Sequence, residues 1–398
     1  MKIHIITGFP FPIGLSGTNR LISYTKGLVE LGEEVEIIIV QPTEERKNVF
    51  NKLVRGSFKN IKFEYAYKNT LWPNSLLGKL YVTIISLINS IKIYYKSQSI
   101  VKSDVLITTI DSFSINLPFF ILTRIFRNKF IFIVDEYPKP IRYNKAPNFF
   151  HAIMLKYWFK IFDGIVVMTN SLEDYFRKKK SSNASILIMP MTVEHDRFEY
   201  DDSESPIDCE YIAYIGSFGD NKDGVYDLIK AFSLIEFDNY HIKLMIIGDS
   251  KKMVEMNALN QYCNTLGVEN KIIFTGRIPR DLVPSYLNNA KLLALARPDS
   301  TRAQGGFPTK LGEYLSTGKP VLVTTVGEIP NYLEDGKNAF LSQPGDPEEF
   351  AKKMMYILEN YTEACIVGKK GQELALTTFN NKYQANRLQC YLNNITIR

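Results

Sequence analysis

The residues best suited to chemistry lie in one stretch, residues 305–323, which reads GGFPTKLGEYLSTGKPVLV. It begins with Gly305 and Gly306, which allow a backbone to approach a ligand closely. A predicted helix follows, and its N-terminus presents unpaired N–H groups and a positive dipole end. One turn further along, Glu313 is a carboxylate that could accept hydrogen bonds from a ribose. The stretch therefore predicts a seat for a nucleoside diphosphate.

The elements that position this stretch begin with a predicted βαβ unit at the start of the chain. The strand-like run Ile3–Thr7 is followed by a loop rich in glycine and proline, a helical segment over Asn19–Leu31 and a second strand over Val35–Val40. The loop lies at the carboxyl end of the first strand, where open α/β sheets bind ligands.

The alternation of strands and helices restarts after an acidic, turn-rich stretch, Asp201–Asp208, which is the best candidate for a linker. We therefore expect an α/β protein with two doubly wound, Rossmann-like domains that face a central cleft. The first would span residues 1–200, with a C-terminal helix at about 380–398 packing back on it. The second, residues 201–379, would hold the nucleotide.

Length and composition agree with two globular domains. The chain has 398 residues, of which 45% are hydrophobic and 23% charged, and its four cysteines show no CxxC pair. Such cysteines are typical of reduced thiols in a cytosolic protein. The start, MKIHIITGF, reads as a first strand, not as a signal peptide. The most apolar helical segment, Leu80–Tyr95, is predicted to be too short and too polar to span a bilayer.

Positive charge is concentrated in the first domain. The formal net charge is +6, but residues 51–150 alone carry fifteen Lys and Arg against five Asp and Glu, interleaved with aromatic residues. Such a surface can bind an anionic membrane leaflet or nucleic acid. The alternative is that it is only a solvated basic face. Nucleic acid is disfavoured because no nucleic-acid module is recognisable. The sequence favours a cytoplasmic protein that can sit peripherally on the inner face of the membrane.

The second half resembles the nucleotide-sugar-binding domain of retaining glycosyltransferases of family 4, which have the GT-B fold. The first half agrees with the same family more loosely. The resemblance of the second half rests on five segments in the family's order, YIGSFGDNKDGVYDLIKAF, LMIIGDS, IIFTGRIPRDLVPSYL, GGFPTKLGEYLSTGKPVLV and GEIPNYLEDGKNAFLSQPGDPEEFA.

The resemblance implies a hexosyltransferase-type enzyme that needs no metal. It would transfer a sugar from a UDP- or GDP-linked donor to a glycan or lipid-linked acceptor, with retention of anomeric configuration, in bacterial surface polysaccharide synthesis. No cofactor besides this co-substrate is implied, and the sequence contains no HExxH motif. Nucleic acid is not an expected partner.

Lys222 matches the family's lysine on the donor diphosphate, where the leaving group gains negative charge, and we count it as catalytic. Glu313 matches the glutamate on the ribose, and Arg277-Ile278 match the segment on the base. The alternative interpretation, from sequence features alone, is that Lys222 is a surface lysine in a turn and that Glu313 is a solvated helix residue. Motifs and resemblance together give the expected donor-binding set, which is Gly17, Ser217, Lys222, Arg277, Ile278, Gly305, Gly306, Phe307, Thr309, Lys310 and Glu313.

Two departures from the family bear on catalysis. The family has two glutamates eight positions apart, but Gly305 occupies the first position, so the residue that contacts the donor sugar is missing. Ser217 stands where the family often has an arginine. Lys310, Arg302 or Arg277 could replace that cation, and Lys310 is the best placed, at the first turn of the helix. The alternative is that Lys310 is a solvated helix lysine.

In the first domain, Gly17 lies at a helix start, where its amide could face the donor phosphates. Asp135 and Glu136 follow a predicted strand, at a position where the family commonly places an acceptor-side His or Asp. A carboxylate there is suited to general-base or hydrogen-bonding work, so both are catalytic candidates. Surface loop acids are the plain alternative.

Two other functions remain open at this stage. The same fold serves sugar-nucleotide epimerases, which act without an acceptor. The missing glutamate and Ser217 also fit a non-catalytic nucleotide-sugar-binding partner of another transferase. A dehydrogenase is disfavoured, because the first loop lacks GxGxxG.

Overall fold

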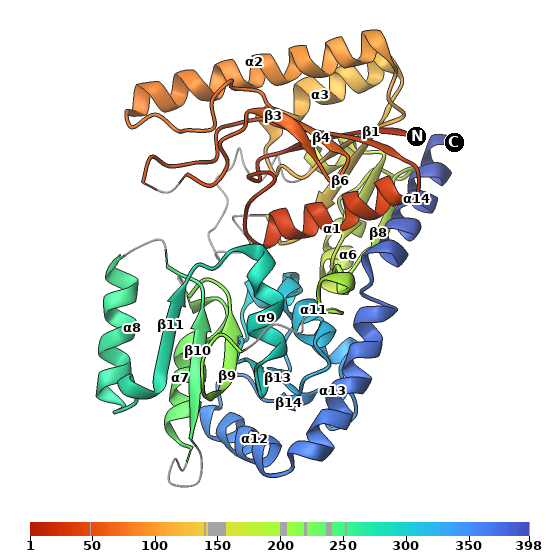
Figure 1. The fold of residues 1–398 in the computed structure, drawn as a ribbon. Helices are drawn as coiled ribbons and strands as arrows, with labels where there is room; N and C mark the ends of the chain where they lie inside the picture. Colours follow the sequence, from red (N-terminus) through yellow and green to blue (C-terminus); the bar gives the residue numbers. More distant parts are fainter. Residues whose placement is uncertain are drawn as a thin grey trace. The chain divides into compact units, whose positions relative to one another are not determined.

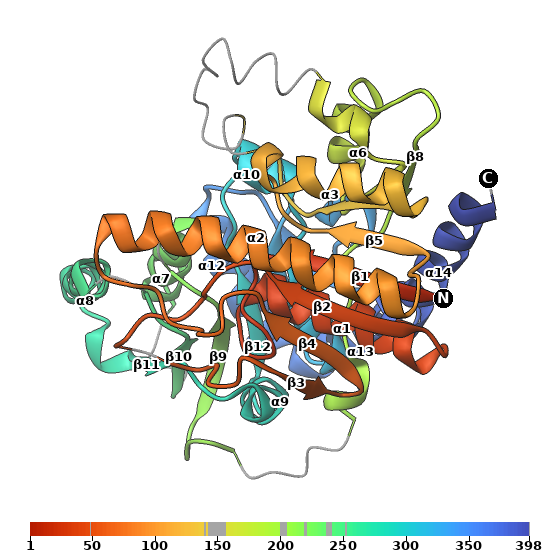
Figure 2. The same ribbon diagram turned by 90° about the horizontal axis from the view of Figure 1, so that it is seen from above.

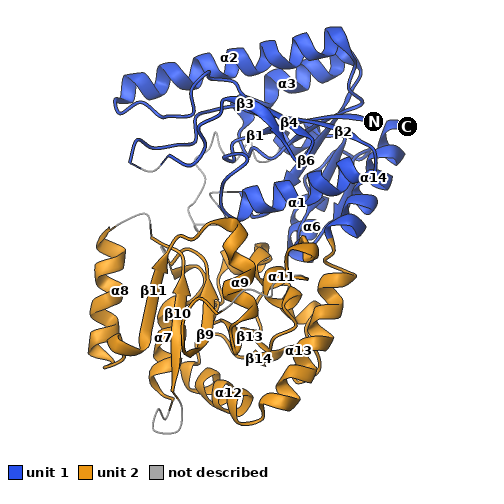
Figure 3. Ribbon diagram, in the orientation of Figure 1, with its two compact units in different colours: residues 1–192, 381–398 blue, residues 193–380 orange. Residues whose placement is uncertain are grey.

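The structure is a computed structural model, which describes residues 1–47, 49–138, 141, 157–199, 205–218, 221–235, 241–250 and 253–397. The chain divides into two compact units (Figure 3). Unit 1 consists of Met1–Thr192 and Asn381–Arg398, and unit 2 consists of Val193–Asn380. Each unit is built around its own sheet (Figure 1).

Unit 1 has an eight-stranded sheet in the order β3-β4-β2-β1-β5-β6-β7-β8. All neighbouring strands are parallel except β3, which runs antiparallel to β4 at one edge. The inner strands are almost entirely apolar and buried, as expected of a parallel sheet covered on both faces. The strands are β1 (Lys2–Thr7), β2 (Glu34–Ile39), β3 (Arg55–Phe58), β4 (Ile61–Tyr65), β5 (Val105–Thr108), β6 (Lys129–Val134), β7 (Gly164–Val167) and β8 (Ser185–Ile188).

Successive strand residues point to opposite faces of the sheet, so both faces carry apolar side chains, and helices cover both. Ile3 and Ile5 of β1 pack in the core beneath α1 and α14, whereas Ile6 packs in the core beneath α2, α3 and α6. The helices of this unit are α1 (Ser16–Glu30), α2 (Leu76–Ile100), α3 (Phe113–Phe126), α6 (Asn170–Arg177) and α14 (Asn381–Ile397).

Unit 2 has a six-stranded, wholly parallel sheet in the order β11-β10-β9-β12-β13-β14. This is the dinucleotide-binding order, in which the winding direction reverses between the first and fourth strands, β9 and β12. The strands are β9 (Glu210–Ile215), β10 (Ile242–Ile247), β11 (Ile272–Gly276), β12 (Leu292–Leu295), β13 (Val321–Thr324) and β14 (Phe340–Ser342). The helices are α7 (Val225–Ser233), α8 (Met253–Thr265), α9 (Val283–Asn288), α10 (Thr301–Gly305), α11 (Thr309–Ser316), α12 (Pro347–Glu359) and α13 (Tyr361–Leu376).

The expected fold class of two parallel α/β sheets is confirmed, with differences at the unit boundary and in two helices. The units divide after Thr192, not at residue 200, because Val193 donates to the carbonyl of Phe379 within unit 2. Residues 201–204 of the predicted linker lie outside the described residues. The sequence analysis also missed α13, which follows α12 after only Asn360.

The apolar helix of unit 1 is longer than the sequence predicted. It starts at Leu76, capped by the Ser75 hydroxyl, which accepts from the Gly78 amide, and it runs for 25 residues. Among the described residues, it is the one helix long and apolar enough to cross a membrane, judged by length and composition. The expectation that the segment is too short was therefore wrong, because serine, asparagine and lysine residues do not interrupt this helix.

We predict that Gly27→Ala destabilises the protein, although glycine-to-alanine changes in helices normally stabilise by about 1 kcal/mol. A Cβ at Gly27 of α1 would lie 2.5 Å from the Cβ of Ala385 and 2.8 Å from the carbonyl oxygen of Asn381, where α14 packs on α1. The resulting overpacking should cost about 1–3 kcal/mol in urea unfolding. Glu30→Ala, on the same helix, is the control and should change stability by less than about 0.5 kcal/mol. Stabilisation by Gly27→Ala would contradict the close packing of these helices.

Candidate functional site

The candidate site of unit 2 lies where the winding of its sheet reverses, at the carboxyl ends of β9 and β12. Ligands of open α/β sheets bind in the crevice at such a point. Figure 2 shows β9 and β12 within the sheet, and the strand order makes them neighbours. The loop after β9 carries Lys222 and Asp223, and the loop after β12 carries Arg297.

A largely buried ion pair joins these loops to α11. Lys310 Nζ lies 2.6 Å from Asp223 Oδ2 and 3.2 Å from the Tyr214 hydroxyl, with the ammonium 4.4 Å from the centre of the Tyr214 ring. The Lys310 and Asp223 side chains are only 14% and 10% exposed. Lys310 is therefore not a solvated helix lysine, and that alternative was wrong.

The electrostatics of the pair follow from burial and from the cations around it. Burial by itself raises the pKa of Asp223, but the positive charges of Lys310 and Arg297, with a smaller effect of Lys222, bring it down to about 2. Burial lowers the pKa of Lys310, against the attraction of Asp223. Three cationic side chains thus act on one carboxylate. Such a group of cations suits an anionic ligand such as a diphosphate.

Two glycines allow the loops to come this close. A Cβ at Gly216 would lie 2.1 Å from Lys310 Nζ, so the lysine can pass beneath the loop only because the residue is glycine. Gly224 has a φ of +69°, and a Cβ there would lie 1.7 Å from the carbonyl oxygen of Ala296, at the end of β12. The loop with Lys222 and Asp223 is therefore pressed against the end of the neighbouring strand.

Arg297 ties this loop to the stretch singled out by the sequence. Its side chain is buried at 2% exposure, and its guanidinium donates to the carbonyls of Gly306 and Arg302 over 3.4 and 3.5 Å. Sequence reasoning did not include Arg297 or Asp223 in the site. The available signal was a cation two residues after the end of β12, beside the reversal of the winding.

Glu313 forms a second ion pair, with the segment that opens unit 2. Its Oε1 lies 3.0 Å from Arg197 Nη1, and the same guanidinium donates to the Arg280 carbonyl over 2.6 Å. Arg280 in turn pairs with Glu194, which is buried. The Glu313 carboxylate is thus held next to the turn that follows Arg277 and Ile278, the segment matched to the base.

The glycine stretch itself differs from the sequence prediction. Gly305 is the buried last residue of the short helix α10, whose start is capped by the Ser300 hydroxyl, and Gly306 is extended. Neither glycine adopts a positive φ. The sequence did not predict helix α10, whose start is stabilised by the Ser300 cap.

The side chain of Phe307 is part of the core. It is 4% exposed, stacks on the Tyr332 ring at 5.4 Å and meets the Phe379 ring edge-on at 5.6 Å. It can therefore position the start of α11 at Thr309, and only its backbone is left for a ligand. The carbonyl of Ser217 accepts from the Tyr214 hydroxyl over 3.1 Å, which places this predicted residue beside the Lys310 pair.

In unit 1, Asp135 compensates a buried charge. Its Oδ1 lies 3.0 Å from Nε of Arg20, which is 1% exposed and also donates to the carbonyls of Met189 and Pro190. This pairing gives Asp135 a structural role at the carboxyl end of β6, and Glu136 follows it in the loop.

Gly17 lies in the first turn of α1, where a Cβ would come within 2.7 Å of the Phe9 ring. The packing of Phe9 thus requires a glycine at position 17. The contact of the Gly17 amide with the donor phosphates stays a prediction.

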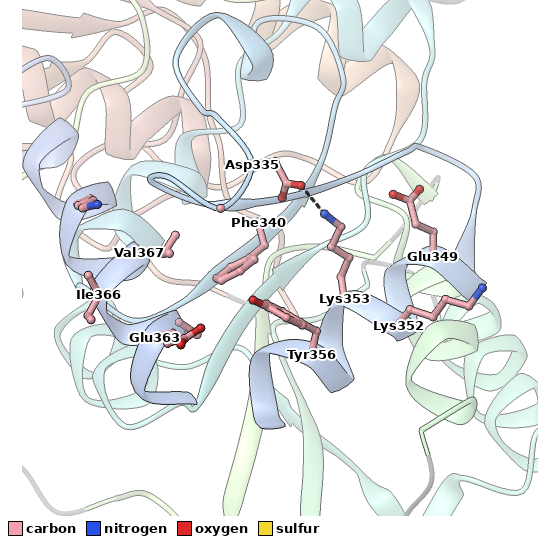
Figure 4. A pocket seen from close by; sticks show the side chains of 12 residues that line it. Asp335, Phe340, Glu349, Lys352, Lys353, Tyr356, Glu363, Ile366 and Val367 are labelled. Carbon is pink, nitrogen blue, oxygen red and sulfur yellow. Dashed lines mark hydrogen bonds and ion pairs between the residues drawn. The ribbon is translucent and has the colours of Figure 1, made fainter. Parts of the chain in front are cut away.

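A pocket of about 630 Å³ lies elsewhere in unit 2, between α12, α13 and the turn before β14 (Figure 4). Phe340 and Tyr356 contribute aromatic rings to its lining, and Lys353 pairs with Asp335 there. Since that turn precedes β14, the pocket lies at the amino end of the parallel strands. None of the predicted site residues lines it.

We predict that Lys310→Met lowers the free energy of unfolding by about 2–4 kcal/mol, because it leaves the Asp223 carboxylate buried without its nearest cation. The loss should be fully present above about pH 4 and shrink towards pH 2, since a lowered pKa stabilises the folded state only while the carboxyl is ionised. The measurement is urea unfolding as a function of pH.

The double variant Lys310→Met, Asp223→Asn should recover part of this loss. Lys291→Met is the matched control, because Lys291 pairs with Glu210 at the surface, 33% and 61% exposed, and should cost less than about 1 kcal/mol. Equal effects of Lys310→Met and Lys291→Met would contradict the buried pair.

Comparison with known proteins gives a family for unit 2. Residues 209–360 match the family model of glycosyl transferases group 1. N-acetyl-alpha-D-glucosaminyl L-malate synthase of Bacillus anthracis is 26% identical over 184 residues, or 46% of this chain and 44% of that protein. The capsular polysaccharide biosynthesis glycosyltransferase CapM of Staphylococcus aureus is 21% identical over 182 residues, or 46% and 45% of the two chains. These matches thus span about half the length of the curated relatives.

Solved structures match over the whole chain. Sucrose-phosphate synthase of Thermosynechococcus elongatus has a TM-score of 0.77 at 15% identity and covers 100% of both chains. HepE of Anabaena, solved in complex with UDP-glucose, has a TM-score of 0.70 at 16% identity and covers 99% of this chain and 100% of that one. At this identity the likeness shows the fold. The chain has the GT-B fold of these proteins, and its residues 209–360 are similar to the glycosyl transferases of group 1.

Proposed function

We propose that this protein is a retaining glycosyltransferase that moves a sugar from a nucleoside-diphosphate donor to a glycan or lipid-linked acceptor of a bacterial surface polysaccharide. The observation that carries the proposal is the group of cations at the reversal of the unit 2 sheet, inside the part of the chain that matches the glycosyltransferase family. HepE bound to UDP-glucose supports a nucleotide-sugar donor, and CapM supports the polysaccharide role.

The proposed chemistry begins with the diphosphate as leaving group. As the bond from the sugar to the phosphate oxygen breaks, negative charge develops on the diphosphate, and Lys222, Arg297 and Lys310 stabilise it. Cations that are already fixed and poorly solvated stabilise a transition state more than mobile ones in water do. The pair with Asp223 fixes Lys310 at 2.6 Å, and Lys222 directly precedes Asp223 in the loop after β9. We therefore assign the catalytic charge stabilisation to Lys222, supported from beneath by Lys310.

The proposed role of Glu313 is to accept the ribose hydroxyls. An ionised carboxylate can accept about four hydrogen bonds. Arg197 uses one of them, on Oε1. The pairing with Arg197 holds the Glu313 carboxylate beside the turn at Arg280. The group that binds the ribose would therefore lie next to the segment that binds the base. Arg277 and Ile278 would contact the base from the same segment.

We assign the acceptor to unit 1. Because Asp135 is engaged by the buried Arg20, Glu136 is the better candidate for contact with the acceptor hydroxyl. The ion pair between Asp135 and Arg20 would then hold the loop after β6, which carries Glu136, in position.

We predict that Lys222→Ala lowers kcat by about 10²–10³-fold, as loss of a preorganised electrostatic contact does in other enzymes. Donor turnover is measured with a panel of UDP- and GDP-sugars and lipid-linked acceptors. Lys230→Ala, on α7 of the same unit, is the matched control and should keep wild-type turnover. Unchanged turnover in Lys222→Ala would remove the diphosphate assignment. Conversion of the donor without any acceptor would favour an epimerase.

We predict that UDP or GDP, whichever is the donor nucleotide, raises the melting temperature, and that Glu313→Gln weakens this binding about tenfold through loss of a charged hydrogen bond to the ribose. Glu348→Gln is the control, because Glu348 is exposed at the start of α12. Binding that is retained by Glu313→Gln would contradict the ribose assignment. Binding without turnover across the whole panel would favour a non-catalytic partner of another transferase.

A further inference from the structure

The outward surface of α2 and α3 in unit 1 is unusually apolar. Figures 1 and 2 show the two helices side by side, and the rings of Tyr95 and Phe126 meet between them at 5.4 Å. We call this surface the α2–α3 face. It is defined by side chains that are 42–85% exposed, which are Leu76, Leu77, Leu80, Tyr81, Ile84, Ile88, Tyr95, Ile100, Val101, Ile121 and Ile125.

The polarity of α2 is inverted relative to an ordinary surface helix. Its buried residues recur at every fourth position and include Ser86, Ser90 and Gln98. Its exposed side carries Leu76, Leu80, Ile84 and Ile88 at the same spacing. A surface helix of a soluble protein turns its apolar stripe towards the core. A contiguous apolar surface that faces outwards indicates an interaction site.

The charges around this face are of one sign. Residues 65–103 contain five lysines and no Asp or Glu, and residues 112–134 contain two arginines and one lysine, again without an acid. Lys79, Lys92 and Lys96 are exposed on α2, whereas Arg124 of α3 is paired with Asp163 at 2.6 Å. Apolar side chains flanked by lysines are the pattern of a helix that lies in an anionic lipid interface.

Helix α2 is held to unit 1 by polar contacts. The Asn128 amide donates to the Tyr94 hydroxyl over 2.8 Å, and the Ser97 hydroxyl lies 2.7 Å from Nε2 of His4. Crossing a bilayer would break these contacts and bury Lys92 and Lys96 in hydrocarbon. The helix is therefore suited to lie on a membrane rather than to span it, although its length would permit a span.

We propose that the α2–α3 face docks flat on an anionic lipid bilayer, with the leucines and isoleucines at the headgroup–acyl boundary and the lysines against lipid phosphates. The cytoplasmic leaflet, which carries the negative surface potential, is the expected membrane. Docking needs no donor nucleotide, so it stands or falls independently of the glycosyltransferase function. For an enzyme with a lipid-linked acceptor, it would bring unit 1 to the surface that holds that acceptor.

The test is co-sedimentation of the full chain with large vesicles of phosphatidylcholine that contain either 30% phosphatidylglycerol or none, without nucleotide. We expect binding to the anionic vesicles that weakens as salt is raised, since screening removes the lysine contribution. The double variant Leu77→Ser, Leu80→Ser should lower the partition coefficient at least about tenfold. The double variant Lys92→Gln, Lys96→Gln should lower it at least about fivefold and flatten its salt dependence.

The matched control is Met253→Ser, Val254→Ser, which removes two apolar side chains that are 80% and 76% exposed on α8 of unit 2. It should bind as the wild type does, and all variants should keep the wild-type melting temperature. The proposal is overturned if the protein ignores anionic vesicles, or if the control loses as much binding as the Leu77, Leu80 variant. It is also overturned if the Leu77, Leu80 variant only abolishes self-association in solution, which would identify a second copy of the chain as the occupant.

Discussion

The candidate site depends on one buried ion pair, between Lys310 and Asp223. Bringing two charges out of water is costly, and the cost is offset only when the geometry is close and further partners are present. Here the pair is supported by the Tyr214 hydroxyl and ring and by the charge of Arg297. The Asp223 carboxylate thus interacts with the positive charges of Lys310, Arg297 and Lys222. A group of cations of this kind is what a diphosphate would need.

The topology of unit 2 explains why these residues can meet. Asp223 follows β9, Arg297 follows β12 and Lys310 opens α11, so they are far apart in sequence. The order β11-β10-β9-β12-β13-β14 makes β9 and β12 neighbours, and their carboxyl ends meet where the winding of the sheet reverses. Gly216 and Gly224 then remove the side chains that would keep the loops apart. Charge, topology and glycine placement support the same site.

Unit 1 uses charge in two other ways. Arg20 is almost fully buried and is satisfied by Asp135 and by two backbone carbonyls, so that a charge stabilises the end of the sheet. On its outer side, α2 instead leaves lysines and large apolar side chains exposed together. The pairing of Arg20 with Asp135 stabilises the folded unit. The arrangement on α2 has no folding benefit, because its apolar side chains gain nothing from facing water.

The sequence by itself determined the two α/β units and most of their strands, because apolar periodicity and helix signals are local properties. It also proposed residues 305–323, with Lys222, Lys310 and Glu313, as the nucleotide site. Only the tertiary structure decided that Gly305 ends a helix, that Phe307 is a core residue and that Arg297 and Asp223 belong to the site. These outcomes depend on burial and on contacts between distant loops. A carboxylate and a lysine reveal their partnership only after the chain has folded and excluded water from between them.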